Sequence, residues 1–204
     1  MRMEMRVTVA CLSGVLLIVA PAFAQTWDTS NPPWAYATAT DEITGQPVLL
    51  AKVESTNTVQ FGFPYQGEQK ATLMLREHPR FGFDIMLYVQ RGQFLCRSEH
   101  CGVLVRFDQQ NPIQWPANPP TDGSTNIIFF KGKLKTPPQQ IINLGGPALL
   151  DELRKASELR IAAQFYQEGE RTFLFDVAGL KWTEPTHPLP PPKPQPSPEE
   201  NPRH

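Results

Sequence analysis

Two cysteines and one histidine are the residues of this chain whose types and spacing could support metal or redox chemistry. Cys96, His100 and Cys101 lie within six consecutive positions. Thiolate and imidazole groups are common zinc ligands, so the cluster is a candidate metal or redox site. Its spacing differs from that of the usual zinc pairs, and the sequence has no Cys-x-x-Cys motif. The alternative is a structural disulfide between Cys96 and Cys101, which requires an oxidising compartment.

The first 24 residues predict that compartment, because they have the pattern of a cleaved export signal. Arg2 and Arg6 form a positive start, residues 7–19 form an apolar stretch, and Ala-Phe-Ala at 22–24 is a small-x-small cleavage site. The apolar stretch is shorter than the roughly 20 residues that span a bilayer. We therefore expect a mature chain that begins at Gln25, is periplasmic or secreted through the Gram-negative type of Sec export, and has no stable membrane span.

The expected compartment favours the disulfide. The third cysteine, Cys11, belongs to the leader, so the mature chain keeps only Cys96 and Cys101. Both cysteines border alternating apolar segments, and the loop between them would therefore be the pinned tip of a β-hairpin. We predict no metal and no cofactor. The candidate interaction surface is this tip together with an aromatic residue from a proline-rich stretch: Arg97, Ser98, Glu99, His100 and Trp115.

No catalytic residue is predicted. The sequence lacks a Gly-x-Ser-x-Gly elbow, a His-Glu-x-x-His motif and a phosphate-binding Gly-Lys-Ser/Thr. Asp84 and Asp108 could act as paired carboxylates if their strands were neighbours, with Asp122 and Asp176 as further acids. Acidic residues at strand ends more often form turns, so we expect no enzyme. Without the leader's two arginines and one glutamate, 17 basic and 19 acidic side chains remain, and this balance does not favour nucleic acid.

Proline sets the expected boundaries of a single domain. Nine of the 22 residues from 183 to 204 are proline, which predicts a disordered, proline-rich tail. Residues 25–46 show no apolar period and are expected to form an N-terminal arm or an irregular strand across the body. The domain itself is predicted to span residues 47–182.

Alternating apolar residues within these limits predict short strands at 48–53, 57–63, 71–76, 83–94, 102–108, 126–131, 159–165 and 173–177. Val59, Phe61 and Phe63 are expected to share one face. Residues 127–130 are apolar at every position, which predicts a central or covered strand. A helix is expected to begin at Pro147. The predicted fold is mainly β: an antiparallel β-sandwich or flattened barrel with one short α-helix before the C-terminal hairpin.

Five short motifs carry a resemblance to a family of uncharacterised exported bacterial β-domain proteins. They are Ser-Thr-Asn at 55–57, Gly-Gln-Phe-Leu-Cys at 92–96, Val-Leu-Val-Arg-Phe-Asp at 103–108, Ser-Thr-Asn at 124–126 and Phe-Asp-Val-Ala-Gly-Leu at 175–180. The same order is distantly similar to the type VI secretion-associated VasI/TagO proteins and to the invasion-associated locus B family. The resemblance covers residues 46–180 and implies a β-rich, extracytoplasmic, non-enzymatic domain.

Two functions follow as expectations. The first is a non-enzymatic periplasmic accessory or interaction protein of a bacterial cell-envelope assembly, which presents a strand edge or the hairpin tip to an unknown envelope protein. The resemblance extends this to a secretion-related assembly. The alternative is a periplasmic module that binds a small glycan or peptide ligand through exposed aromatic residues: Trp115, Tyr65 and Trp182.

Overall fold

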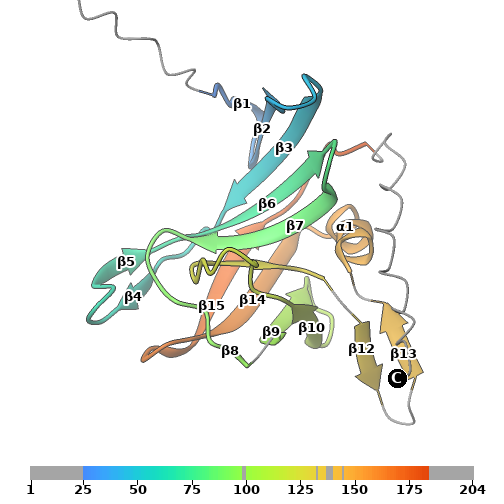
Figure 1. The fold of residues 1–204 in the computed structure, drawn as a ribbon. Helices are drawn as coiled ribbons and strands as arrows, with labels where there is room; N and C mark the ends of the chain where they lie inside the picture. The colour runs from blue at the N-terminus through green and yellow to red at the C-terminus, as the bar shows by residue number, and fades with distance from the viewer. Residues whose placement is uncertain (1–24, 98–99, 132, 137–139, 144, 184–204) are drawn as a thin grey trace, which may run out of the picture.

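The structure is a computed structural model, and it describes residues 25–97, 100–131, 133–136, 140–143 and 145–183. Two antiparallel sheets face each other and curl into a half-barrel (Figure 1). The first sheet has the order β1 (Asp28–Asn31), β2 (Trp34–Thr40), β3 (Pro47–Glu54), β6 (Ala71–His78), β7 (Gly82–Val89) and β11 (Ile127–Phe129). The second has the order β10 (Ile113–Ala117), β9 (His100–Phe107), β14 (Glu158–Phe165) and β15 (Gly169–Asp176), and β8 (Cys96–Arg97) pairs with β9.

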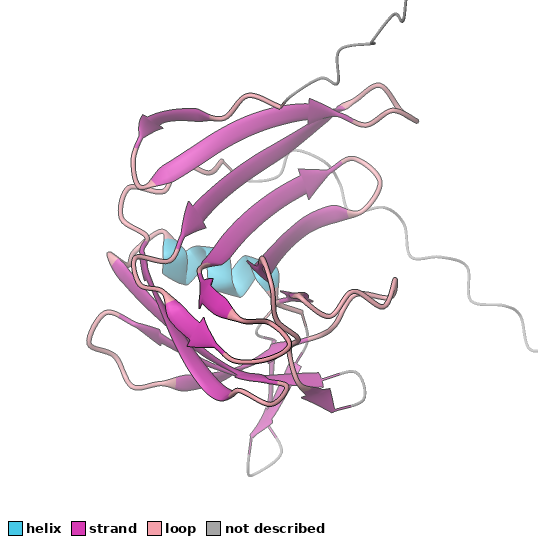
Figure 2. Cartoon of the chain, turned by 90° about the vertical axis from the view of Figure 1, so that its left-hand side faces the viewer, coloured by secondary structure: helices cyan, strands magenta, loops and turns pink. Residues whose placement is uncertain are grey.

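Smaller elements complete the fold. One hairpin is formed by β4 (Val59–Phe61) and β5 (Gly67–Gln69), and another by β12 (Lys133–Thr136) and β13 (Gln140–Asn143). The helix α1 (Gly146–Leu153) begins with Pro147 in its first turn and buries Leu149, Leu150 and Leu153. Figure 2 shows this helix between the two sheets. The predicted fold class is therefore confirmed.

The alternation of apolar residues places the core between the sheets. Leu73 and Leu75 of β6 and Ile85 and Leu87 of β7 are fully buried, and they face the apolar side of the second sheet, where Ile161 lies. Successive strand residues point to opposite faces, so every second side chain is removed from water. Burial of each such side chain stabilises the fold by about 1.5–3 kcal/mol.

The N-terminal segment, expected at residues 25–46 as an arm or an irregular strand across the body, forms two strands of the first sheet. β2 pairs with β3 from Thr40 opposite Pro47 to Ala35 opposite Lys52. Trp34 is buried, and its indole N–H donates to the Val177 carbonyl at 3.0 Å. The small alanines on the other face of β2 gave no apolar period in the sequence, which is why no regular strand was predicted here.

The strand at 126–131 is also placed differently from the prediction. β11 is the last strand of the first sheet rather than a central one. Ile128 is buried, whereas Ile127 and Phe129 are half-buried on the outer face. Phe129 forms an isolated bridge with Asn118, just after β10, so the two sheets meet along this side.

Residues 55–57 join the sheets on the opposite side. The Thr56 amide donates to the Leu174 carbonyl at 2.7 Å. The Asn57 side chain donates to the Thr172 carbonyl at 3.0 Å and accepts from the Leu174 amide at 2.8 Å. These bonds cover the outer edge of β15, which would otherwise present unpaired backbone groups.

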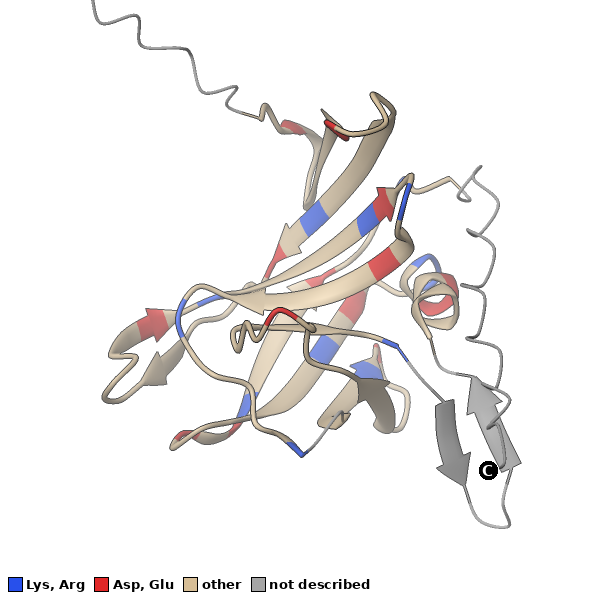
Figure 3. Cartoon of the chain, in the orientation of Figure 1, with Lys and Arg blue, Asp and Glu red and all other residues tan. Residues whose placement is uncertain are grey.

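Acidic and basic residues are scattered over both sheets, as Figure 3 shows. Within the described part of the chain, no helix is both long and apolar enough to cross a membrane.

Candidate functional site

The predicted disulfide is present. Cys96 and Cys101 lie opposite each other in the β8–β9 ladder, with a Cα–Cα distance of 4.1 Å, and their sulfur atoms are bonded. Arg97 lies opposite His100 at the tip. Ser98 and Glu99, the other two residues of the predicted interaction surface, lie outside the described residues. Because Cys101 is buried in the core cluster, the bond attaches the hairpin tip to the body of the second sheet.

Trp115 does not belong to this surface, which corrects the prediction. Its side chain is only 2% exposed. It lies opposite Val103 in the β10–β9 ladder and meets the Phe107 ring edge-to-face at 6.2 Å. Pro112 and Pro116 made this stretch resemble a loop in the sequence, but the ladder continues through it. The indole therefore packs in the core and is not available to a partner.

A group of exposed apolar residues lies beside the disulfide hairpin instead. The Leu95 amide donates to the Gln164 carbonyl at 2.8 Å, and the Tyr166 amide donates to the Gln93 carbonyl at 2.9 Å. This short pairing buries Phe94 and turns Leu95 and Tyr166 outward, where they are 48% and 43% exposed. Arg97 follows on the same strand path.

The loop between β4 and β5 reaches the same end of the molecule. The Gly62 amide donates to the Glu168 carboxylate at 2.6 Å, and the Tyr65 hydroxyl donates to the Gln93 amide oxygen at 3.2 Å. Phe63, between these two contacts, is 78% exposed. Figure 1 shows β4, β5, β8 and the β14–β15 turn gathered at this end, away from α1. We name Phe63, Leu95, Arg97 and Tyr166 the loop-end surface.

An aromatic cluster supports the loop-end surface from below. The Phe165 ring lies 4.6 Å from the Phe94 ring, 5.0 Å from the Phe61 ring and 6.0 Å from the Phe173 ring. Aromatic pairs at such distances contribute about 0.5–1.5 kcal/mol each beyond their buried area. The exposed side chains are therefore carried by loops whose bases are fixed in the core.

The acidic residues considered as catalytic candidates are not brought together. Asp84 lies in β7 of the first sheet, within 2.7 Å of Arg76 and 2.6 Å of Lys131. Asp108 follows β9 of the second sheet and accepts the amides of residues 157 and 158. Asp122 and Asp176 each accept an amide two residues further along, as turn-forming aspartates do. Among the residues with described placement, no group of three or more His, Cys, Asp or Glu could hold a metal.

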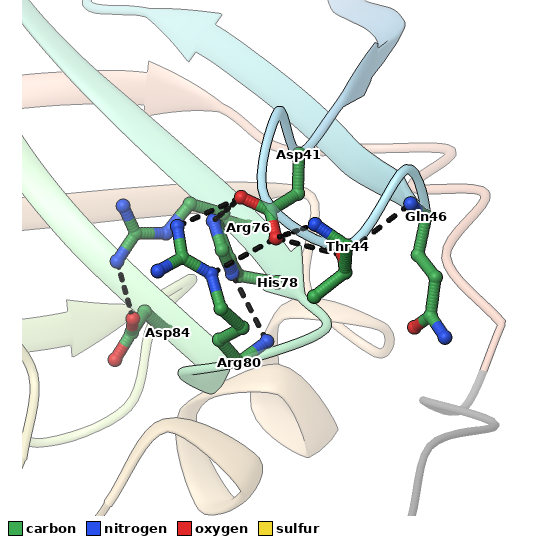
Figure 4. Close-up of polar contacts among 7 residues, drawn as sticks. All are labelled: Asp41, Thr44, Gln46, Arg76, His78, Arg80 and Asp84. Atoms are coloured by element: carbon green, nitrogen blue, oxygen red, sulfur yellow. Dashed lines mark hydrogen bonds and ion pairs between the residues drawn. The ribbon is translucent and has the colours of Figure 1, made fainter.

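A polar cluster that the sequence did not reveal joins the β2–β3 turn to the β6–β7 turn (Figure 4). The Asp41 carboxylate accepts two hydrogen bonds from Arg80, at 2.7 and 2.9 Å, and one from the Thr44 hydroxyl at 2.7 Å. The Arg80 guanidinium is the main reason that the pKa of Asp41 is lowered to about 2. His78 Nε2 lies 3.9 Å from the same carboxylate, and burial lowers the pKa of the imidazole.

This cluster has a structural role. The carboxylate is already engaged with Arg80, and His78 Nδ1 accepts the Arg80 amide at 3.1 Å. A shallow pocket of about 490 Å³ borders the cluster. The ion pair fixes two turns that are 39 residues apart in the sequence, and this separation is why no local pattern could reveal it.

We expect Asp41→Asn to remove an acid-dependent part of the stability. Asp41 has a pKa of about 2 in the folded protein, below its ordinary 3.8. Its contribution is therefore complete above about pH 4 and is lost as the pH falls through about 2. The difference in urea midpoint between the wild type and Asp41→Asn should narrow over this window. The difference in urea midpoint between the wild type and Arg80→Gln should narrow over the same window. A difference that is constant from pH 6 to pH 2 for either variant would contradict the assignment.

A second surface feature lies at the edge of the first sheet. A groove of about 530 Å³ is lined by residues from four segments of the chain: Thr26, Trp27, Asp28, Tyr36, Ala37, Thr38, Leu49, Leu50, Lys181, Trp182 and Thr183. Trp182, predicted as an exposed aromatic, lies in its wall and also packs against Phe83 at 5.8 Å. Tyr65 is instead engaged with Gln93 at the loop end.

The fold and these surfaces define an antiparallel β-sandwich with a disulfide-linked hairpin. No protein-family model matches the chain, and neither a curated protein nor a solved structure is significantly similar to it.

Proposed function

We propose that this protein is a non-enzymatic accessory protein of a bacterial cell-envelope assembly, which binds another envelope protein through its loop-end surface. The exposure of Phe63, Leu95 and Tyr166 on loops held by the core carries this proposal. Grouped apolar side chains on a protein surface mark interaction sites more often than scattered ones do. Arg97, at the disulfide-linked hairpin, adds a charged side chain of a type that is enriched in interfaces.

The location is part of the same proposal. A periplasmic or secreted position is supported by the leader pattern at residues 1–24 and by the Cys96–Cys101 bond, which is stable in oxidising compartments. A secretion-related assembly is supported by the distant similarity of the sequence motifs to the VasI/TagO proteins.

The double variant Phe63→Ala/Tyr166→Ala should lose its partner. Buried aromatic anchors commonly contribute 2 kcal/mol or more to binding, so we expect the yield of a specific cross-linked complex in intact envelopes to fall at least about tenfold. The matched control is Tyr88→Ala/Leu104→Ala, which also removes two exposed apolar side chains, from β7 and β9 rather than from the loop-end surface. Equal yields from the two double variants, or a wild type without any cross-linked partner, would refute the loop-end proposal.

A ligand-binding module is the second candidate, and the groove that contains Trp27 and Trp182 favours it. Aromatic rings beside an open cavity suit a glycan or a peptide. A thermal-shift screen with cell-wall fragments tests it: stabilisation by a fragment that Trp182→Ala abolishes would support the module, and no shift with any fragment would exclude it.

A further inference from the structure

Two arginines lie opposite each other on the outer face of the second sheet. Arg106 of β9 is paired with Arg160 of β14 in the antiparallel ladder. The residues on either side of Arg106, Val105 and Phe107, are buried in the core, so the arginine side chain leaves the sheet on the outer face. Residues opposite each other in such a ladder have Cβ atoms about 4.5–5.5 Å apart, and like charges at these positions repel. The pair of arginines therefore does not stabilise the sheet.

Only one of the two guanidinium groups is neutralised by the described residues. Arg160 Nε donates to the Glu158 carboxylate at 2.7 Å. Arg106 has no hydrogen-bond or ion-pair partner within the described part of the chain, and its Nε is also shielded from water. A shielded cationic donor without an acceptor is unfavourable, because it has lost its water and gained no partner. An added anion would therefore be stabilised most at Arg106.

The acidic residues of the neighbouring strand do not neutralise Arg106. Glu170 and Asp176 of β15 project from the same face as their ladder partners on β14. The Glu170 carboxylate accepts from the Gln164 side chain at 3.2 Å, and the Asp176 carboxylate accepts the Ala178 amide at 3.1 Å. Neither of these acids lines the pocket beside the two arginines.

This pocket has a volume of about 240 Å³ and combines positive charge with an apolar wall. Arg106 and Arg160 both line it, together with the apolar side chains of Leu104, Pro112 and Ala162. Pockets for drug-sized ligands have volumes of roughly 300–1,000 Å³, so this one suits a smaller molecule. Such a molecule should carry a negative charge and a compact apolar part.

We propose that the pocket binds the carboxylate of a small organic acid that has a compact apolar body. A guanidinium group matches a carboxylate with two parallel hydrogen bonds, and Arg106 is free to make them. The apolar body of the acid packs against Leu104 and Ala162, which removes apolar surface from water. The pocket shares no residue with the loop-end surface or with the groove that contains Trp182, so this inference depends on neither.

Titration of the full chain with benzoate tests the proposal. In nitrogen-edited NMR spectra, the Arg106 Nε–H and Ala162 amide signals should shift in a saturable way. Benzamide has the same ring without the charge and should bind at least about tenfold more weakly, because it makes no charge-assisted hydrogen bond. Acetate and inorganic phosphate lack the ring and should bind at least about fivefold more weakly. Benzamide or phosphate binding as tight as that of benzoate, or unchanged Arg106 signals, would overturn the proposal.

The variant Arg106→Met separates ligand binding from a structural role, because it removes the charge and keeps an unbranched side chain. Its dissociation constant for benzoate should rise at least about tenfold. Without benzoate, its urea midpoint should equal or exceed that of the wild type, since two like charges no longer face each other. The matched control, Arg91→Met, removes an exposed arginine outside the pocket and should bind benzoate as the wild type does. Equal binding by Arg106→Met and the wild type, or a lower urea midpoint for Arg106→Met, would overturn the assignment.

Discussion

Replacement of Phe165 by alanine should lower the free energy of unfolding by about 3–5 kcal/mol. Phe165 is fully buried, and its ring contacts Phe61, Phe94 and Phe173. The truncation removes the transfer energy of the ring and leaves a cavity among three side chains from separate segments of the chain, so the site cannot easily collapse. Equilibrium unfolding in urea, followed by tryptophan fluorescence, measures the change.

The neighbouring residue provides the control for Phe165. Tyr166 is 43% exposed, so Tyr166→Ala should change the free energy of unfolding by only about 0.5 kcal/mol. The two variants differ in position by a single residue but lie on opposite sides of the same backbone. A loss below about 1 kcal/mol for Phe165→Ala would show that the cluster is not part of the cooperative core.

The second large effect is expected from Gly92→Ala. This change should lower the free energy of unfolding by about 2–4 kcal/mol, because it adds backbone strain and overpacking. The backbone at Gly92 has φ +137°, a conformation that side chains rarely adopt. A Cβ atom there would lie 2.7 Å from Phe61 Cε2 and 3.3 Å from Val89 Cγ2. Both neighbours are buried and cannot move aside freely. The midpoint of thermal or urea unfolding reports the loss.

Two other glycines separate the causes at Gly92. Gly169 also has a positive φ, +67°, but a Cβ atom added there would have no neighbour within 4 Å, so Gly169→Ala reports backbone strain alone. Gly102 has neither a close neighbour nor a positive φ, so Gly102→Ala should be nearly neutral. If Gly92→Ala lowered the free energy of unfolding by no more than Gly169→Ala does, the close approach to Phe61 would make no contribution to the loss.

The fold was predictable wherever one face of a strand is apolar and the other polar. β9 shows this, with Val103, Val105 and Phe107 buried and Leu104 exposed, as the alternation predicted. β2 escaped prediction because its outer face consists of alanines, which carry little hydrophobic signal. The strand β10 was not predicted because Pro112 and Pro116 are typical of loops, although proline is tolerated in an edge strand.

The site was predictable only in its covalent part. The spacing of the cysteines and the compartment expected from the leader pattern were sufficient to predict the Cys96–Cys101 bond. The loop-end surface was not, because alternation placed Phe63 on the inner face with Phe61, whereas β4 ends at Phe61 and the next residues turn outward. The Asp41–Arg80 pair joins two turns from separate hairpins, and contacts of this kind depend on how the hairpins pack rather than on local sequence.

The bond from Trp34 to the Val177 carbonyl also constrains the order of folding, because 143 positions separate its partners. Asn31 makes a similar bond to Gly179 across 148 positions. When the N-terminal residues become free to fold first, strands β3, β6 and β7 can pair early. β1 and β2 reach their final contacts only after residue 181 is also free to fold. Such a high contact order slows folding. The domain is therefore completed only when its C-terminal residues, and not its N-terminal strands, take their places.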